Sequence, residues 1–78
     1  MNKLMDKLVF DYSKLRGRII EKYGYIKEFA KAVGIAPTSL SLKLNNKLYF
    51  SQAEIRRAID MLDIEPGSVT SYFFTVRL

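Results

Sequence analysis

The fold is decided by residues 26–46, which read IKEFAKAVGIAPTSLSLKLNN. Apolar side chains recur every three or four positions in residues 25–33, and this spacing predicts a helix with one buried face. Gly34 follows at the point where the chain must turn, because only glycine takes a left-handed backbone without strain. Pro37 suits the first position of a second helix, which we expect to extend to about residue 44 or 45. The stretch therefore predicts two short helices joined by a glycine turn.

A further helix is predicted before this pair. Residues 13–23 carry an apolar stripe with Ile20 beside it, and Ser13 is the expected N-cap. Gly17 weakens this helix by about 1 kcal/mol, which a close helix crossing at that position would explain. Gly24 is suited to end the helix.

Two more helices are predicted after the pair. Ser51 and Glu54 have the spacing of a capping box, in which two residues satisfy each other's free amides at a helix start. The helix that follows should end near residue 63, and Pro66 can begin a short one that reaches about Tyr72. The sequence therefore predicts an all-α domain of four to five helices.

The two ends of the chain are less regular. Residues 1–12 fit a short helix, a strand or a frayed arm. Residues 73–78 alternate in polarity, which is typical of a terminal strand or an extended tail. We therefore expect one helical domain over residues 13–72, with an arm before it and a tail after it.

Composition limits the available chemistry. The 78 residues include no cysteine and no histidine, which excludes disulfides, thiolate metal sites and histidine-based catalysis. No glycine-rich phosphate loop or metal-ligand cluster appears, so we expect no cofactor, no metal and no enzymatic activity. No uncharged stretch is long enough to span a bilayer. We expect a cytoplasmic protein without a membrane partner.

Charge is distributed unevenly along the chain. The net charge is +5. Residues 14–47 hold eight basic and two acidic side chains, whereas residues 48–78 hold three basic and four acidic ones. A basic half is typical of a surface that binds a polyanion. The same lysines can equally solvate helix surfaces, so charge alone leaves both interpretations open.

The segment around the glycine turn resembles a known family. It is similar to the helix-turn-helix of Cro and lambda-type repressors in the runs Ile26–Ile35, Leu40-Ser41 and Asn45–Lys47. A narrower resemblance, to small regulators encoded by phages and prophages of Gram-positive bacteria, lies in the runs Phe10–Ile19 and Tyr72–Phe74. These resemblances imply a lambda-repressor-like transcriptional regulator in a bacterial host cell. They also imply a double-stranded operator DNA as partner, often bound by a symmetric homodimer.

The resemblance further implies which residues touch DNA when helix 37–45 enters the major groove. The residues that would face base edges are Ala36, Pro37, Thr38, Ser41, Leu42 and Asn45. The residues that would contact phosphates are Tyr25, Lys27, Ser39, Lys43, Asn45 and Lys47. Hydroxyls can bond base edges, and apolar side chains can contact thymine methyls. The alternatives are surface serines without partners and core packing by Leu42.

Three features depart from the family's pattern. Ala36 stands where a capping Ser or Thr is common, so the helix relies on Pro37. Lys43 stands where a buried aliphatic is usual, so Leu44 must take that packing role. The base-facing positions include no Arg, Gln or Glu, which are strong base readers. Specificity would then come from DNA shape and dimer spacing, or the surface binds protein.

The alternative function is an antirepressor or co-repressor that binds a larger phage repressor protein. It is motivated by the aromatics of the second half, Tyr49, Phe50, Tyr72, Phe73 and Phe74. Exposed apolar patches often mark interaction sites. The other interpretation of these rings is packing of the last helix and the tail, or a homodimer interface.

Overall fold

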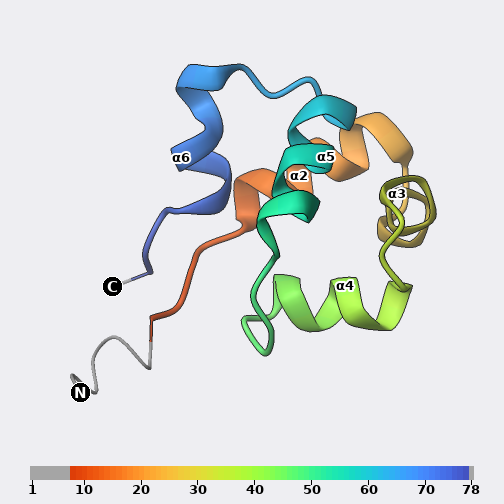
Figure 1. The fold of residues 1–78 in the computed structure, drawn as a ribbon, viewed down its shortest axis with the longest axis horizontal. Coiled ribbons are helices and arrows are strands. Elements are labelled where there is room, and N and C mark those ends of the chain that lie inside the picture. Colours follow the sequence, from red (N-terminus) through yellow and green to blue (C-terminus); the bar gives the residue numbers. More distant parts are fainter. Residues whose placement is uncertain (1–7, 78) are drawn as a thin grey trace.

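Helices form where the apolar patterns predict them. The computed structural model describes residues 8–77 and gives them an all-α fold, as the sequence predicts. In chain order the elements are α2 (Ser13–Tyr23), α3 (Ile26–Val33), α4 (Pro37–Leu44), α5 (Gln52–Met61), the 3₁₀ turn η1 (Pro66–Ser68) and α6 (Val69–Phe73). Figure 1 shows α4 at one edge of the molecule and α6 on the other side of α2 and α5.

The core lies between α2, α3, α5 and α6, with α4 closing one end. Helix α2 packs against α3 and α6, and α3 also packs against α4 and α5. Leu40 and Leu44 anchor α4, with 0% and 3% of their surfaces exposed. The other buried apolar residues are Tyr12, Leu15, Ile19, Phe29, Ala30, Val33, Ile35, Ala58, Leu62, Ile64, Tyr72 and Phe73. Because α4 buries only its inner face, its outer face is free to meet a partner.

The turns that separate the helices use positive backbone angles at the predicted places. Gly34 ends α3 with φ 78° and directs the chain sharply into α4. In Figure 1, α3 is seen along its axis while α4 lies across the view, so the two helices cross steeply. Asn46 takes φ 63° directly after α4, a conformation that asparagine tolerates better than most residues.

A second layer of contacts joins α4 to the start of α5. The predicted capping box is present, since Ser51 Oγ accepts the Glu54 amide at 3.1 Å and Glu54 Oε1 accepts the Ser51 amide at 2.9 Å. Glu54 Oε1 also pairs with Lys43 Nζ at 2.9 Å. Burial opposes ionisation of Glu54, but the bonds from Ser51 and Lys43 outweigh it and lower its pKa.

Two local expectations about α2, on Ser13 and on Gly17, are wrong, and Ile20 lies beside the buried stripe as expected. Ser13 is the first helical residue and not the N-cap; its amide and hydroxyl donate to Asp11 Oδ1 at 2.9 and 2.6 Å. Ile20 is 46% exposed, because the turn of the helix carries it away from the buried stripe. No other element approaches Gly17, where an added Cβ would meet nothing within 4 Å, so a close crossing does not explain the glycine.

The described parts of the arm and the tail pair with each other. Phe10 and Val76 form an isolated antiparallel bridge. Asp11 N donates to Thr75 O, and Arg77 N donates to Val9 O, both at 2.8 Å. The arm and the tail are therefore paired around Phe10 and Val76, while residues 1–7 and 78 lie outside the described part. Within residues 8–77, no helix has the length and apolar character needed to cross a membrane.

The contact of Glu54 with Lys43 and Ser51 predicts a pH-dependent stability. Because the folded pKa of Glu54 is lowered, its contribution to the free energy of unfolding is complete above its ordinary pKa of 4.5 and is lost as the pH falls through the folded value. We expect Glu54→Gln to be less stable than the wild type at neutral pH. It should then lose less stability than the wild type between about pH 5 and about pH 3, as measured by urea unfolding.

A suitable control is Asp60→Asn, which removes an exposed ion pair with Arg56 on the same helix. Exposed pairs of this kind contribute little, so this variant should stay close to the wild type at neutral pH. Equal acid losses in Glu54→Gln and the wild type would contradict the role given to Glu54.

Candidate functional site

The outer face of α4 presents most of the residues predicted to face bases. Ala36, Pro37, Thr38, Ser41, Leu42 and Asn45 are all exposed. Leu42 is 39% exposed, so it does not belong to the core. Leu44 is buried and packs in the core in place of Lys43, as expected from the sequence. The face is uncharged, and Ala36 provides no side-chain cap to the helix.

The residues predicted to contact phosphates fall into two groups. Tyr25, Lys27 and Lys47 are exposed, and Ser39 is half-buried. Lys43 differs, because only 12% of its side chain is exposed and it pairs with Glu54 while donating to Tyr49 O at 3.1 Å. Lys43 therefore stabilises the fold, and its ammonium group is not exposed for contact with a phosphate. Phosphate contact by the other residues stays a prediction.

Asn45 is held by contacts with two helices. Its Nδ2 donates to Ser41 O at 2.9 Å, and its Oδ1 accepts from Arg16 Nη2 at 3.1 Å. The amide is thus tied to α2 and to the last turn of α4. A base contact by Asn45 would require it to exchange these partners.

An apolar surface lies where the arm, the tail and the loop before α5 meet. We call it the aromatic patch and define it as Phe10, Tyr49, Phe74 and Val76. The ring of Phe10 lies 6.5 Å from that of Tyr49 and 6.1 Å from that of Phe74, in edge-to-face contacts. Tyr49 is 60% exposed, Phe74 46% and Val76 41%. Together these side chains form an apolar patch that the other residues of the described range 8–77 leave exposed.

Further rings connect this patch to the core. Tyr12 contacts Phe50 at 5.5 Å between ring centroids, and Phe50 contacts Phe73 at 5.6 Å. Phe73 and Tyr72 are buried, so packing is the correct interpretation of these two rings. Among the aromatics singled out from the sequence, Tyr49 and Phe74 are left facing solvent.

The side chain of Asn46 fixes the arm to the loop after α4. Its Oδ1 accepts the Phe10 amide at 2.8 Å, and its Nδ2 donates to Phe10 O at 2.9 Å. The amide therefore bonds Phe10 as a neighbouring strand would, on the side of the backbone opposite Val76. This pair of hydrogen bonds places the Phe10 ring between Tyr49 and Phe74.

Comparison with known proteins now adds a family and a relative. A family model described as a protein of unknown function, DUF739, matches residues 8–76. The chain belongs to this family. It is also similar to the modulator of repression of the temperate bacteriophage TP901-1 from Lactococcus lactis, whose solution structure is known. The two chains are 42% identical, the match covers 83% of this chain and 88% of the other, and the TM-score is 0.73.

These findings support part of the resemblance drawn from the sequence. The modulator is a phage protein, which agrees with the narrower resemblance to phage-encoded regulators. The matching family model is not one of Cro or lambda-type regulators, so that wider resemblance stays a prediction. A comparison with curated proteins finds no match.

Sequence reasoning missed the contribution of the arm and the tail to this surface. Phe10 and Val76 lie in segments whose structure was left open, and 66 positions separate them. Asn46 lies in the run Asn45–Lys47 that resembles the repressor family, and nothing in the sequence indicates that its side chain bonds Phe10. One signal was available in the sequence. Both segments carry apolar side chains that the packing of the predicted helices does not use.

The bond between Asn46 and Phe10 can be tested with two substitutions. Asn46→Gly keeps the positive φ without strain. Its free energy of unfolding, measured with urea, should therefore fall by the contribution of the two missing hydrogen bonds, about 1–3 kcal/mol. Asn46→Ala should lose about 1 kcal/mol more, because a Cβ disfavours that φ. The Phe10 amide should exchange faster with solvent in both.

Asn45→Ala is the neighbouring control, since its bonds are solvent-exposed and should matter less. An Asn46→Gly variant as stable as the wild type, with a still protected Phe10 amide, would show that the arm is held by something else.

Proposed function

We propose that this chain is a regulatory protein of a phage or prophage that acts by binding a repressor protein. The observation that carries the proposal is the 42% identity, over 83% of the chain, to a phage modulator of repression. Fold and sequence are both similar over that length. In this proposal the chain is a binding protein and has no enzymatic activity.

The aromatic patch supports protein binding. Interface cores are rich in aromatic side chains, and a few such residues usually carry most of the binding energy. Tyr49 and Phe74 present large rings to solvent, and Phe10 holds them in fixed positions through its edge contacts. Burial of these rings against an apolar surface of a repressor would remove them from water.

The state of the basic side chains weakens the argument for DNA. DNA affinity depends strongly on phosphate contacts by free lysines and arginines. In this fold Arg18 donates to the carbonyls of Leu62 and Asp63 and pairs with Glu21. Lys22 pairs with Asp63. The basic surplus of residues 14–47 is therefore partly used to hold α5 against α2.

The patch can be tested with a purified repressor of the phage or prophage that encodes this chain. We expect the two purified proteins to form a complex, with its dissociation constant measured by calorimetry. Tyr49→Ser and Phe74→Ser should each weaken it by about 30-fold, the loss typical of a central aromatic contact.

Ile20→Ser is the matched control, because Ile20 is an equally exposed apolar residue on α2 outside the patch. It should leave the affinity unchanged. Equal losses in all three variants, or no complex with the wild type, would reject the proposal.

Operator binding by α4 is the second candidate function. The observation that favours it is the exposure of Thr38 and Ser41 on the outer face of a helix that follows a glycine turn. This arrangement is the one in which a helix-turn-helix offers its second helix to the major groove.

A gel-shift experiment with DNA flanking the gene decides this candidate. Specific binding should weaken steeply as salt rises, and Thr38→Ala/Ser41→Ala should reduce sequence preference. Retention of the wild-type preference in the double variant would remove these two residues from base reading.

A further inference from the structure

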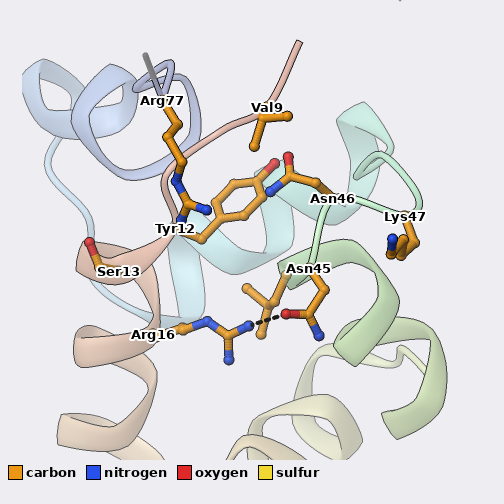
Figure 2. Close-up of a pocket in the computed structure, with 9 residues that line it drawn as sticks. Val9, Tyr12, Ser13, Arg16, Asn45, Asn46, Lys47 and Arg77 are labelled. Atoms are coloured by element: carbon orange, nitrogen blue, oxygen red, sulfur yellow. Dashed lines mark hydrogen bonds between the residues drawn. The ribbon is translucent and has the colours of Figure 1, made fainter. Parts of the chain in front are cut away.

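A cavity of about 320 Å³ lies between the start of α2, the end of α4 and the tail. Figure 2 shows Arg16, Lys47 and Arg77 around it, with Tyr12 and the two asparagines after α4 between them. The three cationic side chains come from three segments that are distant in the sequence. The fold therefore concentrates positive charge around one hollow.

This charge is not balanced within the described residues. No carboxylate lines the cavity. Neither Arg16, Lys47 nor Arg77 forms a salt bridge with any residue of the range 8–77, and Arg16 donates only to Asn45 Oδ1. Asp11 lies near Arg77, but its carboxylate accepts the amide and hydroxyl of Ser13. The cavity is thus rich in donors and lacks an anion.

Tyr12 adds a hydroxyl to the lining of the cavity. The residue is only 5% exposed, and its ring packs against Phe50. Its hydroxyl makes no hydrogen bond to another described residue, and in Figure 2 it points along the cavity toward Asn46. No buried side-chain oxygen or nitrogen of the described residues lacks a partner, so the Tyr12 hydroxyl is not an orphaned group; it lines the cavity, where it can donate to a group that enters.

The arm and the tail place this cavity next to the aromatic patch. Side chains alternate between the two faces of an extended segment. The bridge puts Phe10 and Val76 on the face of the patch, while their neighbours Val9 and Arg77 line the cavity. A protein that covers the patch would therefore have the cavity beside it.

We propose that this cavity binds a side-chain carboxylate, a Glu or Asp, of the repressor that covers the aromatic patch. The proposal rests on the proposed function and names a specific contact within it. Guanidinium groups bind carboxylates in a planar, two-bonded geometry, and the Tyr12 hydroxyl can donate to the same group. A phosphate of duplex DNA is fixed between sugars on a convex backbone, so it fits less well against a residue as recessed as Tyr12.

The site can be tested first without a repressor. N-acetylglutamate amide is titrated into the full ¹⁵N-labelled chain, with N-acetylglutamine amide as the uncharged match. We expect shifts of the Arg16, Asn45, Lys47 and Arg77 resonances with the glutamate compound only, with a millimolar dissociation constant. Equal responses to both compounds, or shifts elsewhere, would overturn the proposal.

Variants show whether the charges are responsible. Arg16→Gln/Arg77→Gln should abolish the response, whereas Lys27→Gln/Lys31→Gln on α3 should preserve it. Both double variants should keep the wild-type spectrum outside the substituted regions. Loss of the response in the α3 variant, or its persistence in the cavity variant, counts against the site.

Two further experiments distinguish this proposal from its alternatives. A short DNA duplex at physiological salt should leave the bound glutamate compound in place, and displacement by the duplex would reassign the cavity to phosphate. With the repressor, Arg16→Gln/Arg77→Gln should weaken binding by about tenfold or more, the loss of a charge-assisted hydrogen bond. Unchanged repressor affinity would overturn the carboxylate contact while leaving the proposed function intact. A repressor that does not bind the wild type would reject the function, while the glutamate titration still reports on the cavity.

Discussion

The side-chain amide of Asn46 positions both the aromatic patch and one wall of the cationic cavity. A left-handed residue after α4 directs that amide onto the main chain of Phe10, and both of its polar atoms are used. Phe10 then supports the rings of Tyr49 and Phe74 on one face. On the other face the same arm, paired with the tail, closes one wall of the cationic cavity. One asparagine therefore positions both features from which a binding role is argued.

The helical framework was largely predictable, because its determinants are local. The spacing of apolar residues located the helices, and the glycine after α3, the proline of α4 and the Ser51–Glu54 box located their ends. The errors were local as well. Ser13 is the first residue of α2 and not its N-cap, and its hydroxyl donates to Asp11 Oδ1 and accepts no amide of the first turn.

The interaction surface was much less predictable, because it depends on contacts between residues far apart in the chain. Nothing near Phe10 or Val76 indicates that they are paired. Charge was misleading for the same reason. In the sequence, the surplus of basic residues fits a surface that binds a polyanion as well as it fits solvated helices. In the structure, Arg18, Lys22 and Lys43 are bound to carbonyls or carboxylates of the second half. A count of charges cannot distinguish a lysine that joins two helices from one whose ammonium group is free to bind a phosphate.

The pairing of arm and tail has a consequence for how the molecule can be switched. The two segments are joined to each other by two backbone hydrogen bonds, and Asn46 holds only the arm, whereas the helices share a continuous apolar core. Local opening at the periphery of a fold costs less free energy than global unfolding. A protease cut just beyond Phe73, or a fusion that pulls the tail away, would therefore dismantle the surface and leave the helices folded. Such a chain would keep its helical spectrum and lose the aromatic patch, so helicity alone is no guide to whether that surface is intact.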